Sequence, residues 1–442
     1  MSSLPQPEVI SLGCRLNIAE SETIRGLLGD RDVVVVNSCA VTNAAVKQTR
    51  AAIRRARRAR PGAMLAVTGC AAQIDPVGFA AMPEVDRVIG NSDKLSADAW
   101  AASDTLIVRD MARVTEIAPH LAVAIDQSRA FVEVQNGCDH RCTFCMIPFG
   151  RGPSRSAPAG AVLDAIERMV AAGKQEVVLT GVDLTSYGHD LPGSPTLGSL
   201  VERILARTAL PRLRLSSIDA PEIDDRLFAL LTCEPRVMPH LHLSLQAGDD
   251  TILKRMKRRH SRADAVRLVA DLKAIRPEIA IGADLIAGFP TEDEGMAANT
   301  LALIDDCDIV HAHIFPYSPR VGTPAARMPQ VASELRRARA ARLREAAGRR
   351  KAAWRDDLIG TKQEILVEAP GDRGHSSSFA DVSLDKTYPV GSIIEAVLDS
   401  ANIRHPRKSG DPASAPSTSG HGSEMGPRFC GGDDEIEVTA TA

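Results

Sequence analysis

The stretch Gly137–Cys145 reads Gly-Cys-Asp-His-Arg-Cys-Thr-Phe-Cys and follows an apolar, strand-like run at 131–135. It places Cys138, Cys142 and Cys145 at C-x3-C-x2-C spacing. Three thiolates are one fewer than a closed zinc site or a fully ligated iron–sulfur cube needs. A [4Fe–4S] cluster on these thiols would leave one iron open to a substrate or cofactor. Two alternatives stay open: a zinc site completed by a remote residue, and chance clustering of cysteines.

Length, composition and net charge narrow the class of protein. A chain of 442 residues suggests about three domains, and 44% hydrophobic residues suffice for buried cores. The net charge is −3, so a nucleic-acid surface must be local, and 3% aromatic residues disfavours large base-stacking platforms. The N-terminus has no apolar signal region, and no apolar run is long enough to cross a membrane. These features predict a cytoplasmic protein with reduced thiols and no membrane partner.

Residues 6–92 are predicted to form an N-terminal α/β domain with a parallel sheet, because strand-like and helical patterns alternate there. Asn17 is the predicted cap of the first helix, and the second helix is predicted at 43–60. The run at 32–36 is continuously apolar, as in a strand buried on both faces. The predicted strands lie at 8–12, 32–36, 63–68 and 85–89.

Cys14, Cys39 and Cys70 each follow the end of one of these strands. In open parallel sheets, the loops at the carboxyl ends of the strands form the ligand crevice. We therefore expect the three thiols to converge as a second three-cysteine cluster site. The alternative is three separate buried cysteines, which behave as small apolar residues.

Residues 93–128 are predicted to be a connector, and residues 129–355 a second alternating region. Six strand–helix units fall short of the eight of a closed barrel, so the region is predicted to be a partial (β/α)6 barrel with a lateral opening. The predicted strands are 131–135, 176–180, 212–217, 240–245, 279–285 and 310–315, with a final helix at 333–355.

Residues 356–404 carry short strand-like runs separated by glycine-containing turns, which predicts a small C-terminal β-barrel. Residues 405–442 are rich in serine, proline and glycine and are predicted to be disordered. Cys430 in this tail is expected to be an exposed free thiol.

The C-x3-C-x2-C motif, with an aromatic residue before its last cysteine and at the end of the first barrel strand, resembles the radical-SAM superfamily. The resemblance implies S-adenosylmethionine (SAM) as cofactor and its reductive cleavage to a 5′-deoxyadenosyl radical. Arginine presents a planar fork to carboxylates, so two arginines are expected at the SAM carboxylate. The implied SAM contacts are Phe144 at the adenine, Thr180, Gly181 and Asp183 at the amino group, Arg151 and Arg155 at the carboxylate, and Ser244 and Gln246 as further candidates.

Further motifs resemble the methylthiotransferases within that superfamily; they lie at 11–17, 37–42, 68–71, 243–250, 282–290 and 315–323. The resemblance implies a second [4Fe–4S] cluster on Cys14, Cys39 and Cys70 whose open iron carries the sulfur to be inserted. One SAM would methylate that sulfur, and another would supply the radical that activates a C–H bond. A sulfur donor and a reducing electron donor such as flavodoxin or ferredoxin are implied as partners.

The residues after the first two N-terminal cysteines, at 13–17 and 39–42, look most like the branch that acts on N6-threonylcarbamoyladenosine-37 in the tRNA anticodon loop. Two other substrates stay open: isopentenyladenosine-37 of tRNA and a ribosomal-protein aspartate. A rival from another class is a non-catalytic Fe–S RNA-binding protein that senses redox state.

Basic residues cluster at 47–60, 254–262 and 336–355, which favours local phosphate contacts; the alternative is a solvated helix face. The C-terminal strands resemble the TRAM domain, an RNA-binding module. The chain departs from the family at Ala247 and Asp219, and its last TRAM strand is not recognisable. Cys233 and Cys307 have no partner at ligand spacing and are predicted to be incidental.

Overall fold

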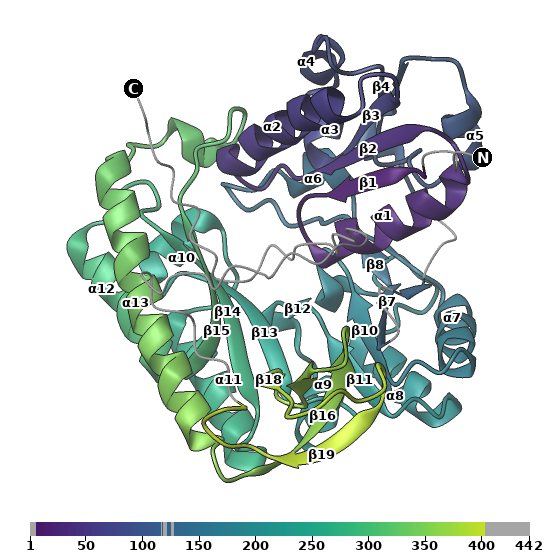
Figure 1. The fold of residues 1–442 in the computed structure, drawn as a ribbon. Helices are drawn as coiled ribbons and strands as arrows, with labels where there is room; N and C mark the ends of the chain where they lie inside the picture. Colours follow the sequence, from purple (N-terminus) through teal and green to yellow (C-terminus); the bar gives the residue numbers. More distant parts are fainter. Residues whose placement is uncertain (1–5, 116, 118–121, 125–127, 403–442) are drawn as a thin grey trace.

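Three sheet-containing regions follow one another along the chain, and the first two are built mainly of parallel strands (Figure 1). The computed structural model describes residues 6–115, 117, 122–124 and 128–402. The tail predicted at 405–442, with Cys430, lies outside the described residues. Among the residues described, no helix combines the length and the apolar character that crossing a membrane requires.

The N-terminal sheet has five parallel strands in sequential order and is covered on both faces. Its strands are β1 (Glu8–Ser11), β2 (Val33–Ser38), β3 (Met64–Gly69), β4 (Arg87–Ile89) and β5 (Leu106–Ile107). Val34 and Val36 pack with helix α2 (Asn43–Ala59), whereas Val33 and Val35 pack with α1 (Arg15–Leu28). Since both faces bury apolar residues, the run is continuously apolar, and the predicted parallel α/β sheet is confirmed.

Asn17 does not cap the first helix as predicted. Helix α1 begins at Arg15 with Cys14 as its N-cap residue, and Asn17 is buried inside the helix. Its side-chain amide donates to the backbone oxygens of Leu12 (2.9 Å) and Ser38 (3.0 Å). Asn17 therefore ties the loops after β1 and β2 together. The other helices of this region are α3 (Cys70–Ile74), α4 (Pro76–Ala80) and α5 (Ala97–Ala101).

The second region carries the six predicted strand units as a partial barrel. The third unit is split, because β11 pairs with β10 while β12 pairs with β13; a parallel bridge from Leu213 to Val237 joins the two halves. The strands are β7 (Arg129–Glu133), β10 (Glu176–Thr180), β11 (Arg212–Leu215), β12 (Ser217–Ile218), β13 (His240–Gln246), β14 (Ala280–Ala287) and β15 (Ile309–Pro316). A short strand, β6 (Ala122–Ala124), pairs antiparallel with β7 at one edge.

Helices cover the outer face of the barrel strands. They are α7 (Ala159–Ala171), α8 (Leu197–Arg207), α9 (Asp225–Cys233), α10 (Asp250–Met256), α11 (Arg262–Ile275), α12 (Glu294–Asp306) and the long α13 (Ser333–Asp357). Shorter elements are the β8–β9 hairpin (Gln135–Asn136 and Arg155–Ser156), α6 (Ile147–Arg151), and the 3-10 turns η1 (Met111–Arg113), η2 (Leu184–Ser186), η3 (Ala220–Glu222) and η4 (Pro324–Arg327).

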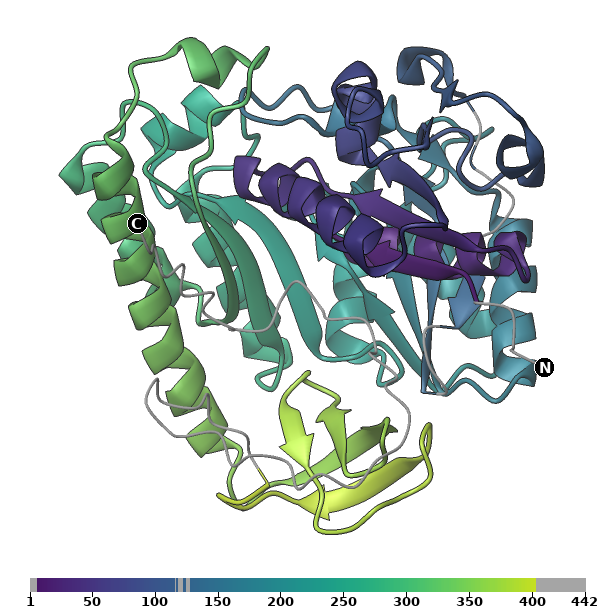
Figure 2. The same ribbon diagram turned by 45° about the horizontal axis from the view of Figure 1, so that its top comes forward.

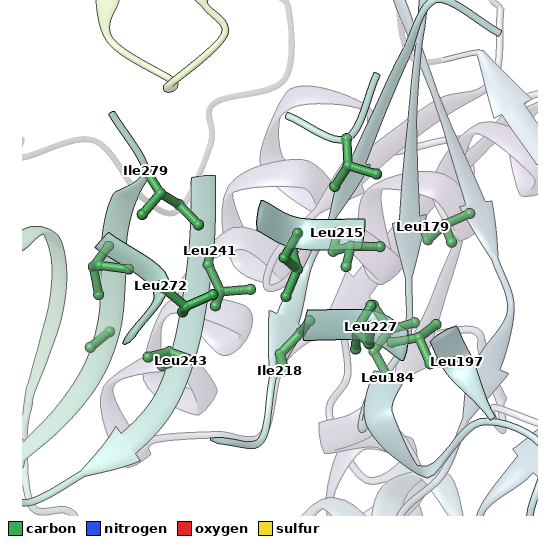
Figure 3. Close-up of a cluster of buried hydrophobic side chains, with 14 of the residues drawn as sticks. Leu179, Leu184, Leu197, Leu215, Ile218, Leu227, Leu241, Leu243, Leu272 and Ile279 are labelled. Atoms are coloured by element: carbon green, nitrogen blue, oxygen red, sulfur yellow. The ribbon is translucent and has the colours of Figure 1, made fainter. Parts of the chain in front are cut away.

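The barrel strands alternate apolar and polar residues, which gives the barrel an apolar outside and a polar lumen. Leu241 and Leu243 of β13 join the main core with residues of the covering helices, such as Leu227 and Leu272 (Figure 3). Successive strand residues point to opposite faces, so the intervening residues point inward. The inward set includes Arg129, Glu176, Arg212, Arg214, His240, His242, Ser244, Gln246 and Asp284.

Helix α1 of the N-terminal region lies against this inner face. Ile18 and Ala19 pack on Phe131 of β7 and Val178 of β10 in one buried cluster. In Figures 1 and 2 the N-terminal sheet accordingly lies beside the open side of the barrel. The lateral opening predicted for a partial barrel is therefore partly filled by the chain's own first helix.

The C-terminal region is a four-stranded antiparallel sheet in the order β18-β17-β16-β19. Its strands are β16 (Lys362–Glu368), β17 (Arg373–Ser376), β18 (Asp381–Ser383) and β19 (Ile393–Val397). A small β-barrel was predicted here, and the strand-rich region fits that prediction. Ser383 at the end of β18 donates its backbone N–H to the backbone oxygen of Asn402 (2.7 Å), which follows β19, so hydrogen bonds also link the two outer parts of the sheet. The predicted strand at 377–383 is interrupted because Phe379 adopts a positive φ of 70° in the turn between β17 and β18.

Residues 93–128, predicted as a connector, add one strand to the N-terminal sheet and one to the barrel. Strand β5 extends the N-terminal sheet beyond β4, and β6 joins the barrel edge. The helix in this segment, α5, packs its Trp100 with the apolar residues under β2.

Candidate active site

The loop that holds Cys138, Cys142 and Cys145 follows β7 and β8 at the carboxyl end of the first barrel strand. Thr143 anchors it: its backbone N–H donates to Met256 O (3.1 Å) and its hydroxyl to Arg255 O (2.8 Å). Gly137 opens the loop with φ +76°, and a Cβ there would lie 1.8 Å from the oxygen of Pro153. Only glycine fits that position, so the entry to the loop is fixed by the backbone.

Polar side chains from other barrel loops surround these thiols. His140 Nε2 lies 2.8 Å from Asp183 and 3.5 Å from Glu222, and these hydrogen bonds raise the pKa of His140 to about 10 against the effect of burial. Arg258 lies with Nη1 3.7 Å from Cys142 Sγ while it also binds Asp219 and the backbone oxygen of Ser244. The loop is therefore held by charged groups on both sides.

The donor set fits an iron–sulfur cluster. Burial raises the pKa of Cys145 to about 12 and also raises the pKa of Cys138, so metal binding by these two thiols would be coupled to loss of their protons. The backbone N–H of Ile147 already points at Cys145 Sγ (3.4 Å), as at a sulfur that carries charge. Soft thiolates in this number suit a cluster that keeps an open iron.

The three N-terminal cysteines converge as predicted from their strand ends. Cys14 caps α1, Cys39 directly follows β2, and Cys70 begins α3. A Cβ on Gly13 would lie 3.1 Å from Cys39 Cβ, and the charge of Cys70 acts on Cys14. Burial of its sulfur raises the pKa of the Cys14 thiol, and the charge of Arg151 opposes that effect.

The two cysteine sets adjoin each other. Helix α6 begins two residues after Cys145 and packs on α3, where a Cβ on Gly150 would lie 3.2 Å from Cys70 Cβ. Asn91 bridges the contact: its amide donates to Gly150 O (2.5 Å) and lies 3.6 Å from Cys70 Sγ. The segment that follows Cys145 is therefore packed directly against Cys70 of the N-terminal set.

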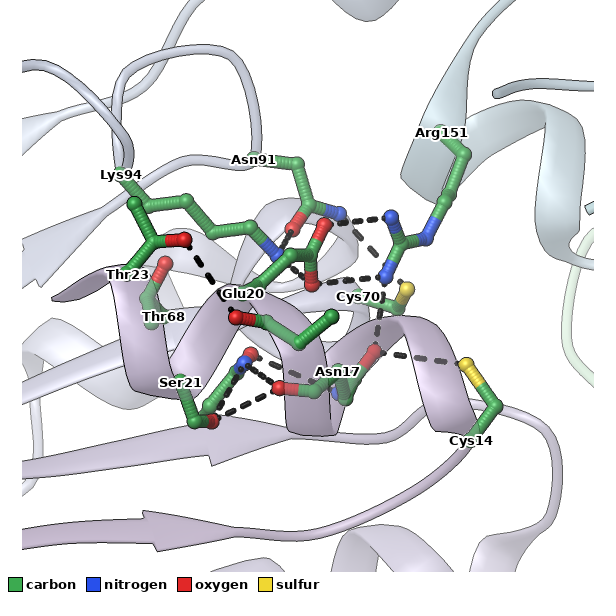
Figure 4. Close-up of polar contacts among 12 residues, drawn as sticks. Cys14, Asn17, Glu20, Ser21, Thr23, Thr68, Cys70, Asn91, Lys94 and Arg151 are labelled. Atoms are coloured by element: carbon green, nitrogen blue, oxygen red, sulfur yellow. Dashed lines mark hydrogen bonds and ion pairs between the residues drawn. The ribbon is translucent and has the colours of Figure 1, made fainter. Parts of the chain in front are cut away.

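A buried polar network supports the N-terminal set (Figure 4). Arg151 donates to Glu20 (2.6 Å) and to Asn17 Oδ1 (2.7 Å), and Lys94 pairs with the same glutamate. Burial alone would raise the pKa of Glu20, but the charges of Arg151 and Lys94 lower it to about 2. Asn17 in turn lies 3.6 Å from Cys14 Sγ.

The two arginines predicted at the SAM carboxylate have hydrogen-bond partners within the chain. The guanidinium of Arg151 is held by Glu20 and Asn17 on the side of the N-terminal cysteines. Arg155 donates to the backbone oxygens of Arg151 (2.9 Å) and Pro153 (2.8 Å) and so closes the turn between them.

The remaining predicted SAM contacts surround the Cys138 loop. Phe144 packs edge-on against Phe289, with ring centroids 6.2 Å apart. Asp183 accepts from Ser186 (2.6 Å), and Cys138 Sγ lies 3.6 Å from it. Thr180 Oγ1 is buried without a hydrogen-bond partner in the described structure, as expected of a group that awaits a ligand.

The other three predicted SAM contacts, Gly181, Ser244 and Gln246, lie at the ends of barrel strands. A Cβ on Gly181 would lie 3.0 Å from Gln135 Oε1, so the backbone passes close to that amide. Ser244 offers its backbone oxygen to Arg258, and Gln246 ends β13 with φ +69°.

Comparison with known proteins identifies the family. Residues 132–304 match the family described as Radical SAM superfamily, and residues 7–90 match the family described as Uncharacterized protein family UPF0004. A threonylcarbamoyladenosine tRNA methylthiotransferase MtaB from Rickettsia prowazekii is 49% identical over 88% of this chain and 94% of its own length. The chain belongs to the radical-SAM methylthiotransferase family.

Other relatives of this methylthiotransferase are more distant. MtaB from Bacillus subtilis is 34% identical over 73% of the chain and 76% of its own length. A tRNA-2-methylthio-N(6)-dimethylallyladenosine synthase from Erythrobacter litoralis is 32% identical over 88% and 94%. The radical SAM methyltransferase TsrM from Kitasatospora setae has a TM-score of 0.50 at 18% identity, covering 67% of this chain and 64% of that one; this likeness concerns the fold alone.

SAM and two [4Fe–4S] clusters are the cofactors of the methylthiotransferase. The two three-thiol sets offer the number of thiols that two clusters with one open iron each would need.

Some polar residues around the two cysteine sets of the methylthiotransferase were not predicted from the sequence. Glu20, Lys94 and Asn91 were not predicted as site residues. One signal was present: Asn17, Glu20 and Ser21 fall on one face of α1 by their i, i+3, i+4 spacing. A polar stripe on a buried helix points to a partner; here the partners are Asn37, Arg151 and Lys94.

Proposed function

We propose that this protein adds a methylthio group to C2 of N6-threonylcarbamoyladenosine-37 in the anticodon loop of tRNA. The observation that carries the reaction is the contact between the two three-cysteine sets at Asn91, Cys70 and Gly150. The substrate is supported by the relatives named for threonylcarbamoyladenosine, of which the Rickettsia prowazekii protein matches over nearly its whole length.

The bound clusters would supply the electron that cleaves SAM at Cys138, Cys142 and Cys145, and the sulfur at Cys14, Cys39 and Cys70. The chain's own groups hold these thiols in place. Arg258 neutralises charge at Cys142, and Asp183 with His140 fixes the turn at Cys138. The network of Asn17, Glu20 and Arg151 holds Cys14 in place.

We assign the predicted SAM-contacting positions around the Cys138 loop to SAM, with Thr180 and Asp183 at its amino group and Phe144 at its adenine. Arg151 is assigned to positioning of the N-terminal set instead, because its guanidinium already serves Glu20 and Asn17.

A tRNA surface is supported by part of helix α2. Three of its arginines and the C-cap Arg60 have carboxylate partners: Arg50 with Asp75, Arg54 with Glu84, Arg57 with Asp86 and Arg60 with Asp32. Lys47, Arg55 and Arg58 are exposed and form no ion pair with any residue that the structure describes. Asn43 at the start of α2 contacts Ser318 and Pro319 after β15, so the helix begins at the rim of the barrel. These three cations are the candidates for phosphate contacts.

Reversal of these charges tests the tRNA surface. The triple variant Lys47→Glu, Arg55→Glu, Arg58→Glu is expected to bind tRNA at least about 10-fold more weakly near physiological salt. The slope of log affinity against log salt is expected to fall by about 2 to 3, since each lost phosphate contact removes about 0.9. Filter binding over a salt series measures both. A control with the same charge change on exposed residues of α7 and α8, Arg168→Glu, Arg203→Glu, Arg207→Glu, is expected to retain the slope; an equal loss in the control contradicts this surface.

Nucleoside analysis tests the proposed substrate. In a strain that lacks the gene, mass spectrometry of total tRNA nucleosides is expected to show complete loss of 2-methylthio-N6-threonylcarbamoyladenosine, with accumulation of the unmodified precursor. The gene restored on a plasmid is expected to bring the product back. The reconstituted protein with SAM and a reductant is expected to form the product on an anticodon stem-loop that carries the precursor.

Other outcomes distinguish the rival functions. Loss of the 2-methylthio derivative of isopentenyladenosine instead would assign the branch of the Erythrobacter litoralis relative. A methylthio group on a ribosomal-protein aspartate would assign the protein branch. Failure of the fully reconstituted protein to release 5′-deoxyadenosine from SAM would favour a non-catalytic redox sensor.

A further inference from the structure

Arg15 extends from the N-terminal domain into the barrel lumen. It is the first residue of α1, directly after Cys14. Its Cζ lies 5.8 Å from the ring centroid of Phe379, which comes from the turn between β17 and β18 of the C-terminal sheet. Arg129 of β7 and Arg214 of β11 face the same ring at 5.6 and 4.8 Å. Three guanidinium groups, one from α1 and two from barrel strands, thus face the same ring in the lumen.

The carboxylates near this cluster already have partners. Glu176 accepts two hydrogen bonds of 3.1 Å from Arg214 and lies 3.1 Å from Arg212, and Glu368 pairs with Arg129. Asp284 lies between His242 (3.0 Å) and His313 (3.1 Å) and binds both.

Arg15 differs from the other charged residues of the lumen because it has no oppositely charged partner among the described residues. Across residues 6–402, apart from the undescribed gaps, no carboxylate lies within ion-pair distance of its guanidinium. The charges that act most strongly on it are the like charges of Arg129 and Arg214. A half-buried guanidinium that lies beside other cations and has no carboxylate partner among the described residues is suited to bind an anion.

We propose that Arg15 binds the carboxylate of the threonyl group on the substrate base and so selects the amino-acid-modified adenosine. This inference rests on the proposed function. C2 and N6 of adenine flank N1 on the same edge of the base, so a base whose C2 reaches the sulfur at Cys14 presents its N6 substituent to neighbouring residues. Arg15, the next residue in the chain, is placed to form a two-pronged, charge-assisted contact with that carboxylate.

The methionine carboxylate of SAM is the other source of the same chemistry. SAM is expected at the Cys138 set, whereas Arg15 adjoins Cys14 and is directed toward Phe379 and Arg214. The position of Arg15 therefore favours the carboxylate of the substrate over that of SAM. Measurements of RNA preference and of SAM affinity distinguish the two sources.

The test compares two RNA probes on the reconstituted enzyme. One anticodon stem-loop carries N6-threonylcarbamoyladenosine, and the other carries its threoninamide analogue, in which the carboxylate is replaced by a neutral amide. The wild type is expected to bind and methylthiolate the amide probe about 10- to 100-fold less well, the value of a charge-assisted hydrogen-bonded pair. This arm needs no variant, so it does not depend on the folding of a mutant.

The variant Arg15→Gln completes a double-mutant cycle. It is expected to treat the two probes alike within about 3-fold, because the partner of the carboxylate is gone. Arg15→Lys is expected to retain part of the discrimination, since it keeps the charge but not the fork. Arg25→Gln on the exposed side of the same helix is the control and is expected to discriminate like the wild type. Iron content and 5′-deoxyadenosine release without RNA are expected to be unchanged in the control Arg25→Gln.

Three results would overturn the inference. The first is an Arg15→Gln enzyme that still prefers the carboxylate probe as strongly as the wild type does. The second is a selective loss of SAM affinity with the RNA preference intact, which would assign Arg15 to the SAM carboxylate. The third is a wild type that does not distinguish the probes. If the wild type modifies neither probe but modifies an isopentenyladenosine stem-loop, the proposed function itself fails, which is a separate outcome.

Discussion

Replacement of Cys142 by serine is expected to abolish both SAM cleavage and methylthiolation, each by more than about 100-fold. A serine hydroxyl does not replace a thiolate on a soft iron site, and loss even of an outer-shell partner at a metal site costs about 10- to 100-fold. Cys14→Ser is expected to abolish methylthiolation to the same extent while leaving SAM cleavage within about 3-fold, because its thiol belongs to the other set. Release of 5′-deoxyadenosine and product formation on the stem-loop measure the two activities separately.

Cys233→Ser is the matched control, because Cys233 is an exposed thiol at the end of α9 that belongs to neither set. It is expected to retain both activities and the full iron content of the reconstituted protein. A Cys14→Ser enzyme that still methylthiolates would refute the assignment of a sulfur-presenting set. Loss of SAM cleavage in Cys14→Ser would mean that the two sets do not act independently despite their separate loops.

The sequence predicts those features of the fold and site that local pattern dictates. Continuous apolar strands such as 33–36 have no solvent-facing side and mark a sheet covered on both faces. Thiols placed after successive parallel strands meet at one sheet edge, because all those strands end on the same side. This rule alone predicts that Cys14, Cys39 and Cys70 lie close together, without any information on the contacts between them.

Features that depend on packing between distant segments were not predictable. Arg151 was expected at the SAM carboxylate because it follows the radical motif, yet its partner, Glu20, is 131 residues away on α1. The docking of α1 on the inner face of β7 decides this contact, and no local pattern encodes the docking. The same holds for Phe379 of the C-terminal sheet, which stacks on His375 with ring centroids 4.5 Å apart and lies against Arg214 of the barrel.

Removal of the Glu20 carboxylate is expected to produce a large loss of stability, because this carboxylate neutralises two buried cations. Glu20→Ala would leave Arg151 and Lys94 as buried charges without their shared partner, and each is almost fully buried. Loss of one partner of a buried pair costs about 3 to 5 kcal/mol in the free energy of unfolding. The variant is also expected to lose iron from the N-terminal set, because Asn17 and Arg151 would no longer be fixed beside Cys14.

The neighbouring pair on the same helix gives the control. Glu22 and Arg25 pair on the exposed side of α1, so Glu22→Ala is expected to cost less than about 1 kcal/mol. The difference between wild type and Glu20→Ala should also depend on pH. The pKa of Glu20 falls from 4.5 to about 2 on folding, so its stabilising effect is complete above pH 4.5 and is lost as the pH falls toward 2. Urea unfolding at pH 7 and at pH 3 measures this; an unchanged difference between the two pH values would show that packing, and not the charge of Glu20, holds α1 in the barrel.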